Sequence, residues 1–65
     1  MIYERILEYC KDNHISVTDF EKECGIANGL VGKWKSGKTQ PSLRILSKIQ
    51  NATGISIGYW IGGVL

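Results

Sequence analysis

Hydrophobic residues recur at helical spacing over the first third of this chain. Ile2, Ile6 and Tyr9 share one face of a segment whose remaining positions are largely charged. The pattern predicts an amphipathic helix over residues 2–12, because an apolar stripe of this period is what a helix buries against a core. A second helix is expected over residues 17–24, after a short turn.

Three more helices are expected in the rest of the chain. They are predicted over residues 28–35, from Leu43 to Thr53, and over a short segment that begins at Ile57 and ends at Gly62-Gly63. Leu43, Leu46 and Ile49 are expected to form the buried stripe of the longest of these. The sequence therefore predicts an all-α fold of five short helices, with residues 1–65 forming a single domain.

Residues 16–42 carry the most specific pattern in the chain. Ser16 and Asp19 have the types and spacing of a capping-box helix start. Gly25 lies where the helix should end and the chain should take a positive φ. An apolar residue in the turn and two apolar positions on the next helix follow. This order is typical of two short helices that cross steeply over one core and leave the outer face of the second helix exposed.

The pattern resembles the helix-turn-helix of the phage repressor and Cro family of regulators (Xre type). The run GKTQPSL, residues 37–43, matches the Gly-Lys-x-x-Pro-Ser-Leu sequence that leads from the recognition helix of that family into its next helix. The resemblance extends from Ile2 to about Gly62. It implies a lambda-repressor-like fold, with the helix-turn-helix at the second and third helices. It also implies a transcriptional regulator, repressor-like, that binds double-stranded DNA.

The resemblance also implies which residues meet DNA, because the second helix of the motif lies in the major groove. Base contacts are expected from Asn28, Gly29, Gly32 and Lys33. Phosphate contacts are expected from Lys35, Ser36, Lys38, Thr39 and Arg44, together with the N–H groups of the loop around Gly37. Asn28 either contacts a base or caps its own helix. The two glycines either permit a close approach of DNA or relax specificity.

Glu21 departs from the pattern of the family. It stands where the family has alanine or another small residue, at the crossing of the two helices of the motif. We expect its side chain to point outward or to lengthen the crossing, because closely packed helices leave little room for a long acid.

The charges are divided unevenly along the chain. Residues 1–24 contain all six acids and three bases, whereas residues 25–65 contain five bases and no acid. A base-rich, acid-free half is typical of a face that binds a polyanion, and it favours nucleic acid as the partner.

The C-terminal sequence ISIGYWIGGVL is more apolar than a free surface segment needs to be. We expect part of it to form a homodimer contact, a role that the last helix has in several members of the family it resembles. The residues expected in this contact are Ile57, Tyr59, Trp60, Val64 and Leu65. The alternative is that the last helix only covers the core, with Trp60 as its anchor.

Other functional classes find little support. His14 is the only histidine, and Cys10 and Cys24 lie fourteen residues apart, so neither a catalytic pair nor a zinc site is expected. No apolar run reaches the roughly 18 residues of a membrane span, and no signal peptide is recognisable. We expect a cytoplasmic protein of a phage or mobile element, with no enzymatic activity, cofactor or small-molecule substrate.

Two alternative functions use the same scaffold. One is a protein-interaction module whose third helix no longer contacts bases, and the other is an antitoxin-type regulator that also binds a toxin. Gly29, Gly32 and the apolar C-terminal segment favour the first of these. The base-rich half of the chain argues against it.

Overall fold

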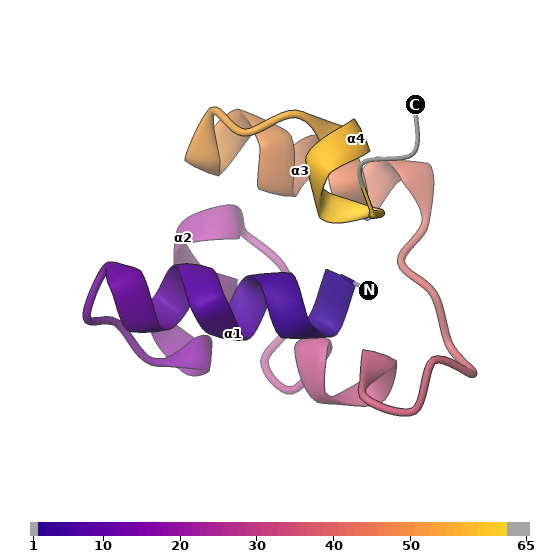
Figure 1. Cartoon of the computed structure of the whole chain (residues 1–65), viewed down its shortest axis with the longest axis horizontal. Helices are drawn as coiled ribbons and strands as arrows, with labels where there is room; N and C mark the ends of the chain where they lie inside the picture. The colour runs from indigo at the N-terminus through magenta and orange to yellow at the C-terminus, as the bar shows by residue number, and fades with distance from the viewer. Residues whose placement is uncertain (1, 63–65) are drawn as a thin grey trace.

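The computed structural model describes residues 2–62, and every regular element in that range is a helix. In chain order these are α1 (Ile2–Asp12), α2 (Val17–Cys24), the 3-10 helix η1 (Val31–Trp34), α3 (Leu43–Thr53) and α4 (Ile57–Trp60). The predicted all-α fold of five short helices is therefore confirmed. The helices α1, α2 and α3 have the expected bounds, whereas α4 begins at Ile57 as expected but ends already at Trp60. Figure 1 shows α1 lying across the other helices, with α4 and α3 on one side of it and η1 on the other.

Local capping interactions explain where α2 begins and ends. The Asp19 N–H donates to the Ser16 hydroxyl at 3.0 Å, and the Ser16 N–H donates to the Asp19 carboxylate at 3.4 Å. Gly25 ends the helix with φ +70°, a conformation in which a side chain would be strained. The capping box and the glycine end predicted from the sequence are both confirmed.

The α3 helix is bounded in the same way. The Ile45 N–H donates to the Ser42 hydroxyl at 3.3 Å, and Gly54 ends the helix with φ +73°. Leu46 and Ile49 are buried as predicted, but Leu43 is 70% exposed. The prediction that Leu43 is buried was wrong because the first residue of the helix lies beyond the edge of the core.

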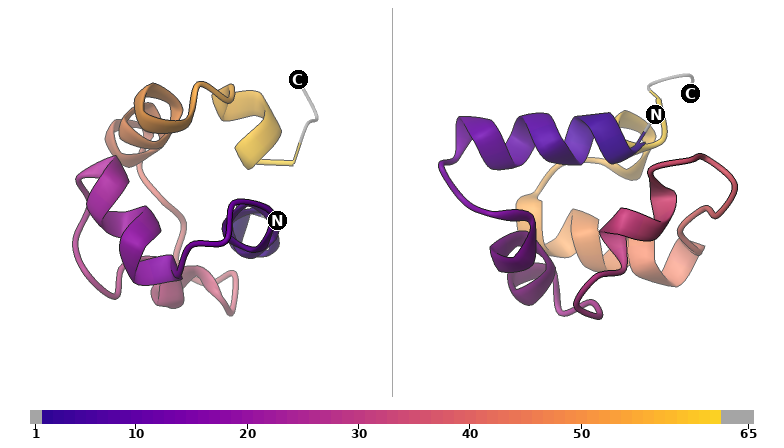
Figure 2. Two further views of the ribbon diagram at one scale, coloured as in Figure 1. Left: turned by 90° about the vertical axis from the view of Figure 1, so that its left-hand side faces the viewer. Right: turned by 90° about the horizontal axis from the view of Figure 1, so that it is seen from below.

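Trp60 lies at the centre of the core and is fully buried. Its ring makes edge-to-face contacts with Tyr9, Phe20 and Tyr59, at centroid distances of 5.7, 6.0 and 5.4 Å. Figure 2 shows how the helices surround this core. Trp60 is therefore the anchor of α4, and its predicted place in a dimer contact is corrected because a fully buried ring has no surface to offer a second copy.

The third helix differs most from its prediction. A helix over residues 28–35 was expected, but the chain makes a turn at residues 28–30 and then a single 3-10 helix from Val31 to Trp34. Gly29 has φ +87°, which is outside the helical region and prevents an earlier start. Val31 and Trp34 are nevertheless buried, so the predicted inward face of this segment is confirmed.

The two cysteines are free and buried. Burial raises the pKa of the Cys24 thiol to about 11, with a smaller contribution from the nearby Glu23 carboxylate. The pKa of Cys10 is also raised by burial. Both thiols therefore stay protonated near neutral pH and pack as small apolar groups. Within residues 2–62, no helix is long and apolar enough to cross a membrane, and no cluster of side chains is suited to hold a metal ion.

Candidate nucleic-acid interface

The chain between α2 and α3 forms one exposed edge of the molecule, at the lower right of Figure 1. It consists of an exposed segment, residues 27–34, and a basic loop, residues 35–40. The four residues predicted to contact bases, Asn28, Gly29, Gly32 and Lys33, are all exposed here. Val31 and Trp34 alternate with them and are buried, so the core holds this segment while its other positions face solvent.

Glu21 is buried and binds the backbone of the exposed segment on its interior side. Its side chain is only 2% exposed. One carboxylate oxygen accepts from the Gly29 N–H at 3.0 Å, and the other accepts from the Val31 N–H at 2.9 Å. Of the two expected outcomes, an outward-pointing Glu21 side chain was therefore wrong. Two backbone donors eight and ten residues away satisfy the acid in the interior.

Asn28 does not cap the helix that follows it. The N-cap residue of η1 is Leu30, which makes no side-chain capping bond. Glu21 instead binds the N–H groups at this end, and Asn28 is exposed with no hydrogen-bonding partner for its side chain among residues 2–62. Of the two roles left open by the sequence, capping is excluded in this structure.

The two glycines of the exposed segment differ in what the fold requires of them. Gly29 has φ +87°, so any side chain there would be strained. Gly32 has no positive φ, and a Cβ built on it would meet no atom within 4 Å. The fold thus explains Gly29 but not Gly32.

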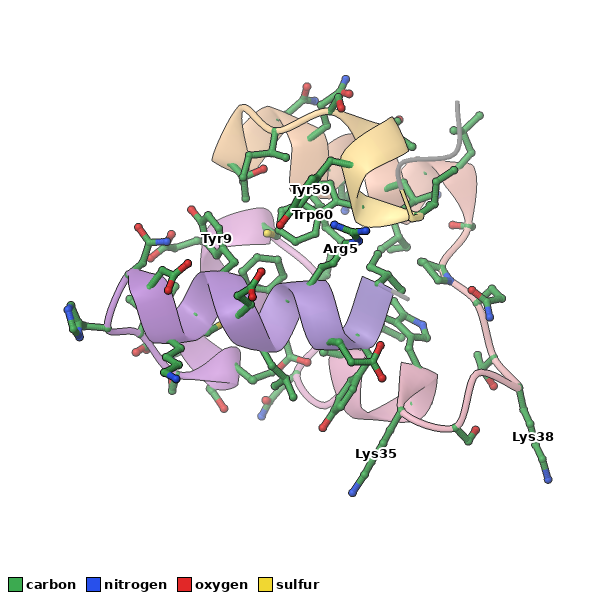
Figure 3. The ribbon with its side chains drawn as sticks, in the orientation of Figure 1. Arg5, Tyr9, Lys35, Lys38, Tyr59 and Trp60 are labelled. Carbon is green, nitrogen blue, oxygen red and sulfur yellow. The ribbon has the colours of Figure 1, made fainter. Side chains whose placement is uncertain are left out.

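The basic loop extends two lysine side chains into solvent. Figure 3 shows Lys35 and Lys38 extending away from the molecule at its lower edge. Both residues are exposed, as are Ser36, Thr39 and, in the first turn of α3, Arg44. The cations among them make no ion pair with another residue of 2–62, and such side chains are suited to contact the phosphates of a nucleic-acid backbone.

The backbone of the basic loop is less free than its side chains. The Gly37 N–H donates to the Trp34 carbonyl at 3.1 Å. The Lys38 N–H donates to the Ser36 hydroxyl at 3.3 Å, and the Gln40 side-chain amide donates to the Gly37 carbonyl at 2.9 Å. The predicted use of loop N–H groups to hold a phosphate therefore does not fit at Gly37 and Lys38, whose donors are already engaged.

The acids and bases that are separated along the sequence are also carried by different elements of the fold. The exposed acids lie on α1 and α2, whereas the bases of the second half lie on η1, the basic loop and α3. Glu21 is the acid nearest in structure to the exposed segment, and it is buried and hydrogen-bonded. No exposed acid belongs to residues 25–62, so the exposed charged side chains of the candidate interface are all basic.

The role of Glu21 in this site was not predicted from the sequence. One feature of the sequence points to it. An acid stands on the preceding helix at the point where the segment after the turn must approach, and the first N–H groups of that segment need acceptors. Because Asn28 can itself cap a helix, the sequence alone does not show that Glu21 supplies the acceptors instead.

Comparison with known proteins supports one family. A family model described as helix-turn-helix matches residues 6–60, which is most of the chain. No curated protein and no solved structure matches it.

Proposed function

Because this chain belongs to the Xre/Cro-like helix-turn-helix family of DNA-binding regulators, we propose that it binds duplex operator DNA sequence-specifically and acts as a repressor-like transcriptional regulator. In this proposal the exposed segment enters the major groove. Asn28 and Lys33 contact base edges there, and Lys35, Ser36, Lys38, Thr39 and Arg44 contact phosphates on either side.

The observation that carries the proposal is that the exposed segment is anchored to the core and is followed directly by the basic loop, which contains no acid. The segment is anchored by the buried Val31 and Trp34 and by the hydrogen bonds of Glu21. Its outward residues, Asn28 and Lys33, are exposed beside the protruding Lys35 and Lys38. A rigid element that presents polar side chains next to phosphate-binding cations is what groove recognition requires.

The experiment that tests this function is selection of bound duplexes from a random-sequence pool, repeated at two salt concentrations. We expect recovery of a defined site, with affinity that falls steeply as salt increases. Salt-sensitive binding without a selected sequence would contradict sequence-specific regulation. Absence of binding at low salt would favour a protein-interaction module instead.

A substitution at Gly32 can test for contact with the groove, because a side chain at this position does not disturb the fold. The change Gly32→Ala is expected to leave the fold intact and to raise the free energy of unfolding by about 0.5–1 kcal/mol, because alanine loses less backbone entropy. We expect the same methyl group to weaken DNA binding, since it would lie between the backbone and the groove. Thermal unfolding and titration with the selected duplex measure the two effects. Unchanged affinity would remove Gly32 from the interface.

We also propose that the regulator binds as a homodimer, with one exposed segment per half-site and half-sites about one helical turn apart. Support comes from the apolar surface of the last helix and the residue after it, where Ile57 is half-buried, Tyr59 is 37% exposed and Ile61 is 44% exposed. Val64 and Leu65, also assigned to this contact from the sequence, lie outside the described residues. Trp60 is not part of the proposed contact.

The change Ile61→Arg tests the proposed dimer. We expect it to shift the protein to a monomer in sedimentation analysis, because a cation in the centre of an apolar contact would be desolvated without a partner. The matched control is Leu7→Arg on α1, since Leu7 is 38% exposed and lies outside the proposed contact. A dimer that persists in Ile61→Arg would exclude this surface as the interface.

A further inference from the structure

The buried carboxylate of Glu21 makes a specific pair of hydrogen bonds in addition to packing in the core. Its two oxygens do not share one donor. Each accepts a different backbone N–H of the exposed segment, from Gly29 at 3.0 Å and from Val31 at 2.9 Å. Two bonds to donors two residues apart fix both the position and the rotation of the chain between them, whereas one bond would leave rotation free.

The backbone around these bonds depends on this arrangement. Gly29 has φ +87°, and the Leu30 N–H closes the turn onto the Ala27 carbonyl at 3.1 Å. No side chain of residues 27–30 caps the start of η1. The acid on α2 therefore supplies from the interior the acceptors that a local cap supplies elsewhere.

One consequence concerns Asn28. A residue at the start of a helical segment often uses its own side chain as the cap and is then bound to the backbone. Here Glu21 provides the acceptors, and Asn28, adjacent to Gly29, is exposed with an unengaged side chain among the described residues. The interior acid thus leaves the amide of Asn28 free to bind an external partner.

We propose that Glu21 is the positioning residue for base recognition: it holds residues 28–31 in one conformation so that Asn28 and Lys33 face the major groove together. This inference rests on the proposed function. Glu21 touches no DNA in this proposal, because it is buried beneath the segment. It contributes to selectivity between sequences rather than to the general attraction of the phosphate backbone, which comes from the lysines of the basic loop.

The test uses Glu21→Gln, which keeps the shape of the side chain but retains only one oxygen acceptor. Its matched control is Glu23→Gln, the same chemical change two residues along α2 at an exposed position outside the interface. The DNA probes are the duplex that wild-type protein selects from a random pool and one duplex of scrambled sequence and equal length. We expect Glu21→Gln to lose about tenfold in the ratio of the two affinities, and Glu23→Gln to keep the ratio within about twofold.

A measurement without DNA reports the local effect directly. In Glu21→Gln, amide hydrogen exchange at Gly29 or Val31 is expected to become at least about tenfold faster, while amides in the middle of α3 keep their wild-type rates. Uniformly faster exchange would mean that Glu21 only stabilises the fold, and it would overturn the inference. Unchanged exchange at both Gly29 and Val31 would overturn it as well.

The change Gly29→Ala perturbs the same segment independently of the acid. Alanine at φ +87° is strained but meets no neighbouring atom, so its effect is confined to the backbone conformation. We expect the double variant, with both Glu21→Gln and Gly29→Ala, to lose less selectivity than the product of the two single-variant losses. The reason is that both changes release the same segment of backbone. Losses that multiply fully would show independent effects and would contradict a common positioning role.

Failure of this inference is distinguishable from failure of the proposed function. If wild-type protein shows no preference for any sequence, sequence-specific regulation fails, and the positioning role in base recognition fails with it. If wild-type protein is selective and Glu21→Gln has the same affinity ratio, the function stands and the positioning role alone is overturned.

Discussion

Replacement of both Lys35 and Lys38 by glutamate is expected to reduce DNA affinity by at least about 100-fold near 0.1 M salt without unfolding the protein. Both side chains protrude from the basic loop at the same edge of the molecule and are exposed, so their substitution removes no core contact. Each cation that neutralises a phosphate releases a counterion, and each reversed charge repels the phosphate instead. Fluorescence titration with the selected duplex, with circular dichroism as a check of folding, measures the effect.

The salt dependence of binding gives a second observable for the same pair. Loss of two phosphate contacts per subunit is expected to lower the slope of log affinity against log salt by about 1.8 for each subunit. The matched control is Lys11→Glu with Lys22→Glu, which changes the net charge equally but lies on α1 and α2, away from the basic loop. If both double variants lose affinity to the same degree, only overall charge matters, and the assigned phosphate contacts are wrong.

The change Trp60→Ala is expected to remove a large part of the free energy of unfolding. Truncation of a fully buried tryptophan costs about 3–5 kcal/mol. At about 0.05–0.15 kcal/mol per residue, a chain of 65 residues has a free energy of unfolding of only about 3–10 kcal/mol. The truncation would also remove the edge-to-face contacts that join α1, α2 and α4 through Tyr9 and Phe20. Urea denaturation followed by circular dichroism measures the loss.

The change Trp60→Phe separates packing from hydrogen bonding at this site. The indole Nε1 is buried and has no hydrogen-bond acceptor among residues 2–62. Phenylalanine removes this unsatisfied donor and keeps an aromatic ring, so we expect a clearly smaller loss of stability than for alanine. Tyr59→Ala, at a 37% exposed ring next to Trp60, is also expected to cost less. A Trp60→Ala variant as stable as wild type would contradict the central place of this ring.

The aromatic contacts also indicate how α4 is held against α1. Figure 3 shows Arg5 close to Tyr59 and Trp60. The Arg5 guanidinium lies 4.6 Å from the centre of the Tyr59 ring, within the range of a cation–π contact. Tyr59 is thus partly engaged within its own subunit. This leaves Ile61 as the more sensitive position at which to test the proposed dimer contact.

The sequence by itself determined the parts of this protein that depend on near neighbours. Ser16, Gly25, Ser42 and Gly54 set the ends of α2 and α3, because a cap needs only partners three or four residues away. The helical spacing of apolar residues identified α1 and most of α3. The residues assigned to the interface from the motif are all exposed in the structure, since that assignment depended on which face of the segment packs inward.

The tertiary structure alone decided the features that depend on distant partners. Glu21 points inward because two N–H groups eight and ten residues away need acceptors. Residues 28–34 form a turn and a 3-10 helix instead of an α-helix. The positive φ at Gly29 lies outside the helical region and is the conformation in which its N–H binds Glu21. Trp60 is in the core because α1 and α2 place Tyr9 and Phe20 around it. In each case the free energy comes from contacts between separate elements, which spacing along the chain does not contain.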